Sequence, residues 1–120
     1  MAPVTIYHNP RCSKSRQALA YVEETGNKIT VVEYLKDPLS KKDLLALLKK
    51  IGKRAEPADL VRTGEKRFKE LGLSKDDIQT ADAVAKLLAK EPVLMQRPVI
   101  VSGSKATIAR SEDALDDFFS

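Results

Sequence analysis

Short runs of apolar and β-branched residues alternate with a longer amphipathic stretch in the first third of the chain. Residues 4–8 and 29–34 have the composition of strands. Between them, Leu19 and Val22 share one face of a helix that we predict over residues 13–25. A helix that joins two neighbouring strands makes a right-handed crossover, so the pattern predicts that the two strands are parallel.

The middle of the chain, from about residue 40 to residue 92, is charged and has helical periodicity. Ser40 offers an N-cap for one helix, and Thr80 offers an N-cap for a second helix that stops before Pro92. The apolar face of the first of these helices consists of Leu44, Leu45, Leu47, Leu48 and Ile51. The pattern predicts a helical segment inserted into the rest of the fold.

The last third returns to strand patterning. Residues 99–102 form a short apolar run, a turn over 102–104 follows, and residues 105–109 alternate as a hairpin partner. Ser111 is a candidate N-cap for a last helix. The order is therefore βαβ, helices, then ββα. It predicts an α/β protein with a thioredoxin-like, mixed four-stranded sheet and helices on its faces. The 120 residues suit a single domain.

Composition narrows the classes of function. No apolar run approaches the ~20 residues that cross a bilayer, and MAPVTIYHN lacks the pattern of a secretory signal. The net charge is only +4 and aromatic residues make up 5% of the chain, which disfavours a nucleic-acid partner. The single cysteine cannot form an internal disulfide, so we expect a reducing cytoplasm.

Cys12 lies where the first predicted strand gives way to the first predicted helix. The unpaired N–H groups and partial positive charge of a helix N-terminus stabilise a thiolate and lower the thiol pKa. The hydroxyls of Ser13 and Ser15 could donate to the sulfur or to a bound anion, and His8 could carry a positive charge. More positive charge comes from Arg11, Lys14 and Arg16. The stretch predicts an activated nucleophile inside an anion-binding loop.

Spacing tests other roles for this cysteine. A C-x-x-C redox motif needs a cysteine at position 15, where the chain has Ser15, and a C-x5-R phosphatase loop needs an arginine at position 18, where it has Ala18. One cysteine and one histidine fall short of a zinc site. A buried, inert cysteine is the remaining alternative, and the polar neighbours disfavour it. Because the chain has no second cysteine, an oxidised Cys12 must be released by an external thiol.

The stretch IYHNPRCSKSR resembles the active-site motif of the glutaredoxin-coupled arsenate reductase (ArsC) family, whose pattern is close to I-Y-H-N-P-x-C-x-x-S-R. The resemblance continues in order through YLKDPLS, DLVRTGE, ELGL, RPVIV and IARSEDAL, over nearly the whole chain. The short form with HNPRCSKSR is most similar to a compact subgroup of that family. One departure is Ser13-Lys14, where family reductases often have Gly-Thr.

The resemblance implies a role for each matched residue. Cys12 is the expected nucleophile, which forms a covalent thioarsenate. Pro98 matches the proline, usually cis, that faces the active cysteine in thioredoxin-like folds. The expected oxyanion-binding residues are Arg62, Arg97 and Arg110. The residues expected to lower the thiol pKa and shape the loop are His8, Ser15 and Arg16.

The activity implied is reduction of arsenate to arsenite, with glutathione as thiol co-substrate, glutaredoxin as partner, and no bound cofactor or metal. Two alternatives stay open. One is an enzyme of the same scaffold that acts on another oxyanion or on a mixed disulfide with glutathione. The other is a regulator that binds RNA polymerase, like Spx-type relatives. Those relatives commonly carry C-x-x-C as a redox switch, and Ser15 disfavours that mode.

Overall fold

The computed structural model describes residues 3–109 and 112–119 of the chain. These residues form two compact units. The sheet unit, as we call it, contains the two ends of the chain, up to Asp37 and from Arg97 onward, and the helical unit runs from Pro38 to Gln96. The boundaries are close to those predicted for the helical insertion, and the single domain stays a prediction. The predicted N-cap Ser111 lies outside the described residues.

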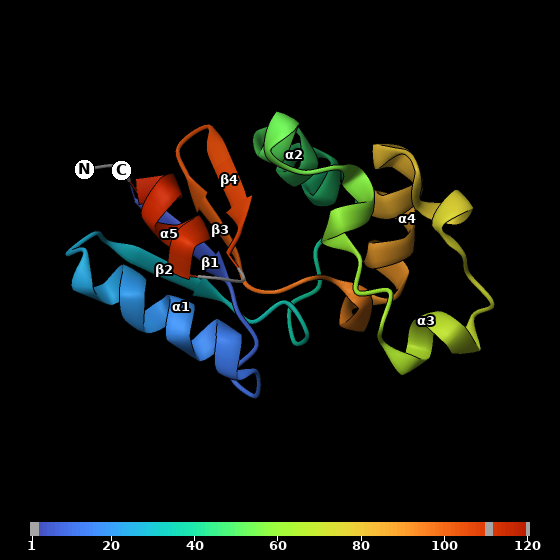
Figure 1. Cartoon of the computed structure of the whole chain (residues 1–120), viewed down its shortest axis with the longest axis horizontal. Coiled ribbons are helices and arrows are strands. Elements are labelled where there is room, and N and C mark those ends of the chain that lie inside the picture. Colours follow the sequence, from blue (N-terminus) through green and yellow to red (C-terminus); the bar gives the residue numbers. More distant parts are fainter. Residues whose placement is uncertain (1–2, 110–111, 120) are drawn as a thin grey trace. The chain divides into compact units, whose positions relative to one another are not determined.

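The sheet unit is built on four strands, β1 (Val4–Tyr7), β2 (Ile29–Val32), β3 (Val99–Ser102) and β4 (Lys105–Ile108). Their order is β2-β1-β3-β4 (Figure 1). The strands β1 and β2 are parallel, and the pairs β1–β3 and β3–β4 are antiparallel. The predicted mixed sheet is therefore confirmed, with each end of the predicted strands within two residues of the observed one.

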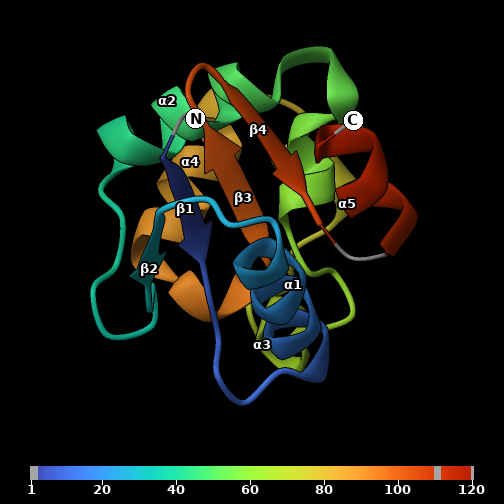
Figure 2. The same ribbon diagram turned by 90° about the vertical axis from the view of Figure 1, so that its left-hand side faces the viewer.

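Two helices, α1 (Ser13–Glu24) and α5 (Glu112–Phe119), pack on the same face of this sheet (Figure 2). Gly26 follows α1 with a φ of 76°, a backbone conformation that glycine adopts without strain. The buried core between helices and sheet consists of Val4, Ile6, Ala18, Val22, Ile100, Ala109 and Leu115. This core anchors α1, and thereby fixes the end of the helix at which Cys12 lies.

The helical unit contains α2 (Lys41–Ile51), α3 (Lys66–Glu70) and α4 (Ala81–Lys90), and α2 packs against α4. Both predicted N-caps are confirmed. The Asp43 N–H donates to Ser40 Oγ at 3.1 Å, and the Ala83 N–H donates to Thr80 Oγ1 at 3.1 Å. Four short 3₁₀ helices make up much of the rest: Gly52–Arg54, Pro57–Leu60, Lys75–Ile78 and Pro92–Leu94.

No helix in the described part of the chain is long and apolar enough to cross a membrane.

Candidate active site

Strand pairing brings the two segments of the candidate site to one end of the sheet. Tyr7, the last residue of β1, pairs with Val99, the first residue of the antiparallel strand β3. The loop that leaves β1 toward Cys12 therefore lies at the end of the sheet where the chain enters β3. The residues that enter β3 are Arg97 and Pro98, and the peptide bond between them is cis, the isomer that the resemblance implied.

Hydrogen bonds around Asn9 and Pro10 fix the conformation of the loop before α1. The Asn9 side-chain oxygen Oδ1 accepts from the Arg11 N–H at 3.0 Å, and the Asn9 backbone carbonyl accepts from the Cys12 N–H at 3.0 Å. From the first turn of α1, Arg16 Nη1 donates to the Pro10 carbonyl at 2.8 Å. Cys12 becomes the N-cap residue of α1, with extended backbone and no side-chain capping bond. Its sulfur is thus left for other contacts.

Ser15 and His8 form a buried pair beneath this loop. Ser15 is fully buried, and its Oγ lies 2.6 Å from His8 Nδ1 and accepts from the Asn9 N–H at 3.0 Å. The Ser15 group that hydrogen-bonds the Cys12 sulfur is the backbone N–H, instead of the hydroxyl that we considered from the sequence. Ser15 therefore links the His8 ring to the backbone of the loop at Asn9.

Burial lowers the pKa of His8 below its ordinary value, and Arg16 lowers it further, although Glu33 opposes both effects. The His8 imidazole is therefore neutral near pH 7. The prediction that His8 adds positive charge is wrong, because burial of the ring disfavours the charged form. Near neutral pH its part in the site is the contact with Ser15.

The pKa of Cys12 is below its ordinary value, as predicted from the helix N-terminus. Burial of the sulfur raises this pKa, and hydrogen bonds outweigh the effect. The donors are the backbone N–H groups of Ser15 and Lys14 and the side chain of Arg97, whose positive charge also lowers the pKa. Cys12 is only partly buried. The site therefore holds an accessible sulfur whose donors favour the thiolate over the thiol.

Arg97 has donor capacity that the protein leaves unused. Its Nε is buried and makes no hydrogen bond within the described residues. A buried N–H group without a partner costs free energy, and an anion bound at the site would supply the missing acceptor. An unpaired donor is what we expect of a side chain that binds an oxyanion, which is the predicted role of Arg97.

The other two predicted oxyanion residues are Arg62 and Arg110. Arg62 belongs to the helical unit, where its Nη1 lies 3.1 Å from Glu65 Oε2. Both side chains of this ion pair are partly buried, with 31% and 27% of their surface exposed. Arg110 lies outside the described residues. Their roles remain predictions.

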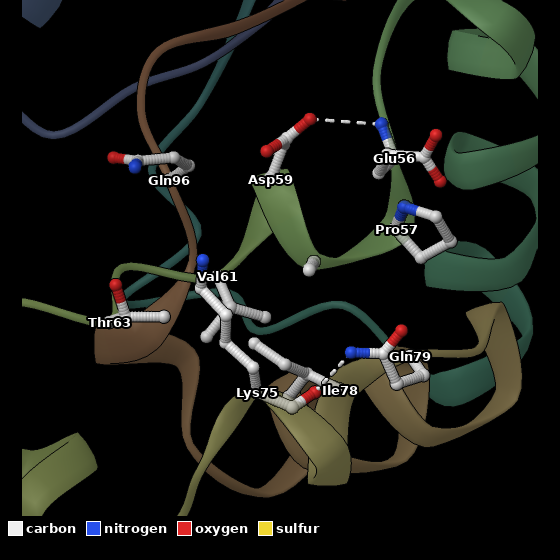
Figure 3. A pocket seen from close by; sticks show the side chains of 10 residues that line it. Glu56, Pro57, Asp59, Val61, Thr63, Lys75, Ile78, Gln79 and Gln96 are labelled. Atoms are coloured by element: carbon white, nitrogen blue, oxygen red, sulfur yellow. Dashed lines mark hydrogen bonds between the residues drawn. The ribbon is translucent and has the colours of Figure 1, made fainter.

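The helical unit contains a polar pocket of about 470 Å³ (Figure 3). Its apolar lining consists of Pro57, Ala58, Val61 and Ile78, and its polar lining consists of Glu56, Asp59, Thr63, Lys75, Gln79 and Gln96. The ten lining residues include neither cysteine nor histidine. No group of three His, Cys, Asp or Glu among the described residues could hold a metal ion.

A smaller pocket of about 250 Å³ adjoins the Cys12 loop within the sheet unit. Part of its lining comes from the loop after β1, and the rest comes from Glu33, Leu35 and Lys36 after β2. The sequence pattern did not single out these three residues as part of a site. The signal that could have found them is topological, because the carboxyl ends of neighbouring parallel strands meet at one edge of a sheet, where ligands gather.

Comparison with known proteins decides the family. The model of the family described as the ArsC family matches residues 7–118. The chain belongs to the ArsC family. It is 37% identical over 110 residues to an arsenate reductase of Neisseria meningitidis, covering 92% of each chain. It is 41% identical over 107 residues to Escherichia coli YfgD, described as an uncharacterized protein, covering 89% of this chain and 88% of YfgD.

Solved structures agree with this assignment. This ArsC protein superimposes on the arsenate reductase from Vibrio cholerae with a TM-score of 0.84 at 36% sequence identity. The match covers 96% of this chain and 97% of the other. The predicted thioredoxin-like α/β fold is therefore confirmed.

Proposed function

We propose that this ArsC protein is an oxidoreductase that reduces arsenate to arsenite, with Cys12 as the nucleophile. The observation that carries the proposal is the surrounding of the Cys12 sulfur: two backbone N–H groups and the Arg97 side chain hydrogen-bond it and lower its pKa. These donors suit the negative charge of the thiolate and of an incoming tetrahedral oxyanion alike. The arsenate reductases among its relatives supply the substrate class.

In the first step, the Cys12 thiolate attacks arsenic. A sulfur–arsenic bond forms, one arsenic–oxygen bond breaks, and the oxygen leaves as water after taking up protons. Arsenic is still in the +5 state in this thioarsenate. In this step Arg97 stabilises the oxyanion through its guanidinium group, and its buried Nε, which has no partner among the described residues, gains an acceptor.

Reduction then requires external thiols, because Cys12 is the only cysteine in the chain. Glutathione adds to arsenic and displaces a second oxygen as water. A glutaredoxin thiolate next attacks the glutathione sulfur and forms a mixed disulfide with it. The electron pair of the broken sulfur–arsenic bond reduces arsenic from +5 to +3. Water then releases arsenite and restores Cys12. We assign this cycle to the reducing cytoplasm, where such thiols are kept.

The test is arsenate-dependent oxidation of glutathione in the presence of glutaredoxin. We expect turnover by the native protein and none by Cys12→Ser, because a serine hydroxyl is a poor nucleophile at neutral pH. Lys28→Ala, an exposed substitution in the same unit, is the control and should retain activity. No turnover by a native protein whose Cys12 still reacts with iodoacetamide would contradict arsenate as substrate.

A further inference from the structure

The smaller pocket, which we call the loop pocket, lies beside the residue that precedes the nucleophile. It has a volume of about 250 Å³ and lies wholly within the sheet unit. The loop after β1 and the segment after β2 form it together. Its lining residues are His8, Asn9, Pro10, Arg11, Glu33, Leu35 and Lys36. Arg11 directly precedes Cys12 in the chain, so the pocket is lined by the same loop that leads to the nucleophile.

The loop pocket combines an apolar surface with three charges. Leu35 keeps 44% of its surface exposed, which is high for a leucine, and Pro10 adds further apolar surface. Arg11 and Lys36 contribute two positive charges, and Glu33 contributes one negative charge. Lys36 Nζ lies 3.6 Å from Glu33 Oε1, and 77% of the Lys36 side chain is exposed. Such an exposed ion pair is weak, so a charged ligand can separate it at little cost.

We propose that the loop pocket binds glutathione and presents its sulfur to Cys12. This rests on the proposed function, which requires an external thiol. At neutral pH glutathione carries two carboxylates and one ammonium group. These charges are the complement of two cations and one carboxylate in the pocket, and the apolar surface accepts the methylene groups of the tripeptide.

The same pocket should also direct exchange with glutathione disulfide, a reaction that needs no arsenate. The Cys12 thiolate attacks one sulfur of the disulfide, a Cys12–glutathione disulfide forms, and the other half leaves as glutathione thiolate. The number of disulfide bonds is unchanged. This reaction measures recognition of glutathione apart from the reduction of an oxyanion.

The test compares two charge reversals in the full-length protein. Lys36→Glu places a second carboxylate in the loop pocket, whereas Lys28→Glu makes the same change of charge at an exposed residue of the sheet unit that does not line it. We expect Lys36→Glu to slow the reaction with glutathione disulfide about tenfold, and Lys28→Glu to change it less than about threefold, because distant exposed charges are screened by salt.

Two probes exclude a general effect on the thiol. Bis(2-hydroxyethyl) disulfide and iodoacetamide carry no charge, and both should react with Lys36→Glu at the native rate. The direct measurement uses S-methylglutathione, which cannot exchange. Its addition should shift the backbone amide signals of Arg11 and Leu35 in the native protein and leave them unshifted in Lys36→Glu.

Equal slowing of the charged and uncharged disulfides by Lys36→Glu would overturn the proposal. So would a loss that appears only with glutaredoxin and spares free glutathione, since the pocket would then serve a protein partner. Failure of arsenate turnover with these glutathione results intact would count against the proposed function alone. Intact arsenate turnover with no effect of Lys36→Glu on any glutathione step would count against the loop pocket alone.

Discussion

The resemblance predicts that Arg97 and Arg62 both bind the oxyanion, but the two side chains have different surroundings in the structure. Arg97 in the sheet unit hydrogen-bonds the Cys12 sulfur and keeps a buried Nε without an acceptor among the described residues. Arg62 in the helical unit is paired with Glu65 at 3.1 Å, three residues along the chain. An anion at Arg97 would supply the acceptor that Nε lacks, whereas an anion at Arg62 would compete with the Glu65 carboxylate.

The difference shows how each unit holds a charged side chain. Arg97 is held by the sheet, because the pairing of Tyr7 with Val99 brings the entry to β3 beside the exit from β1. Arg62 is held locally, by Glu65 and by a backbone bond from its N–H to the Leu94 carbonyl at 2.7 Å. We therefore expect Arg97 to be the stronger determinant of chemistry at Cys12.

The largest effect should come from Arg97→Ala. Loss of one preorganised donor typically costs about 2.7–4 kcal/mol of transition-state stabilisation, so turnover should fall about 10²–10³-fold. The same substitution should raise the pKa of Cys12, since the Arg97 hydrogen bond and charge both lower it. Arsenate turnover and the pH dependence of iodoacetamide alkylation measure the two effects.

Arg97→Lys is the matched variant, because it keeps the charge and removes the guanidinium fork. It should restore part of the low Cys12 pKa and little of the turnover. Full turnover in either variant, with protein that is folded by circular dichroism, would contradict the role of Arg97.

Arg62→Ala should have a smaller effect on turnover, on the order of 1–2 kcal/mol. A charged hydrogen bond contributes about 1.5–3 kcal/mol, and breaking the pair with Glu65 offsets part of that gain. The pKa of Cys12 should stay at its native value, since Arg62 is not among the groups that shift it. Glu65→Gln should lower the KM for arsenate if Arg62 binds the oxyanion. An unchanged KM in Glu65→Gln with full turnover in Arg62→Ala would remove Arg62 from the site.

Features that depend on near neighbours in the chain could be predicted from the sequence. The Ser40 cap needs only Asp43 three residues later, and the position of Cys12 needs only a strand followed by a helix. The parallel pair of β1 and β2 followed from the handedness of the connection through α1. The role of Arg97 came from the family resemblance, and the structure adds a contact with the sulfur.

Features that depend on burial could not be predicted in this way. The sequence shows that His8 is close to Cys12, but only the fold buries the ring and makes it neutral. The sequence also shows a hydroxyl at Ser15, which the fold directs to His8 and Asn9. The loop pocket required the segment after β2 to lie beside the loop after β1, which no local pattern reveals.

Ser40→Ala should lower the free energy of unfolding without changing the site in the sheet unit. The serine accepts the Asp43 N–H at the start of α2, and loss of such a cap costs about 1 kcal/mol. The free energy of unfolding in urea should fall by that amount. The Cys12 alkylation profile should not change, because the cap belongs to the helical unit and the groups that shift the thiol belong to the sheet unit. A shifted alkylation midpoint would show that the site depends on α2.

The smallest effect is a pH dependence that belongs to the sheet unit alone. Burial lowers the pKa of His8 from its ordinary value of 6.5, so below pH 6.5 the unfolded chain binds a proton that the folded chain does not. The contribution of His8 to stability is therefore complete above pH 6.5 and is lost as the pH falls through the folded-state pKa. His8→Asn keeps a polar group near Ser15 and should make the free energy of unfolding less dependent on pH in this range. Because His8 is the only histidine, one imidazole proton signal reports its titration directly. A midpoint at or above 6.5 would show that the Glu33 carboxylate, not burial, controls the charge of His8.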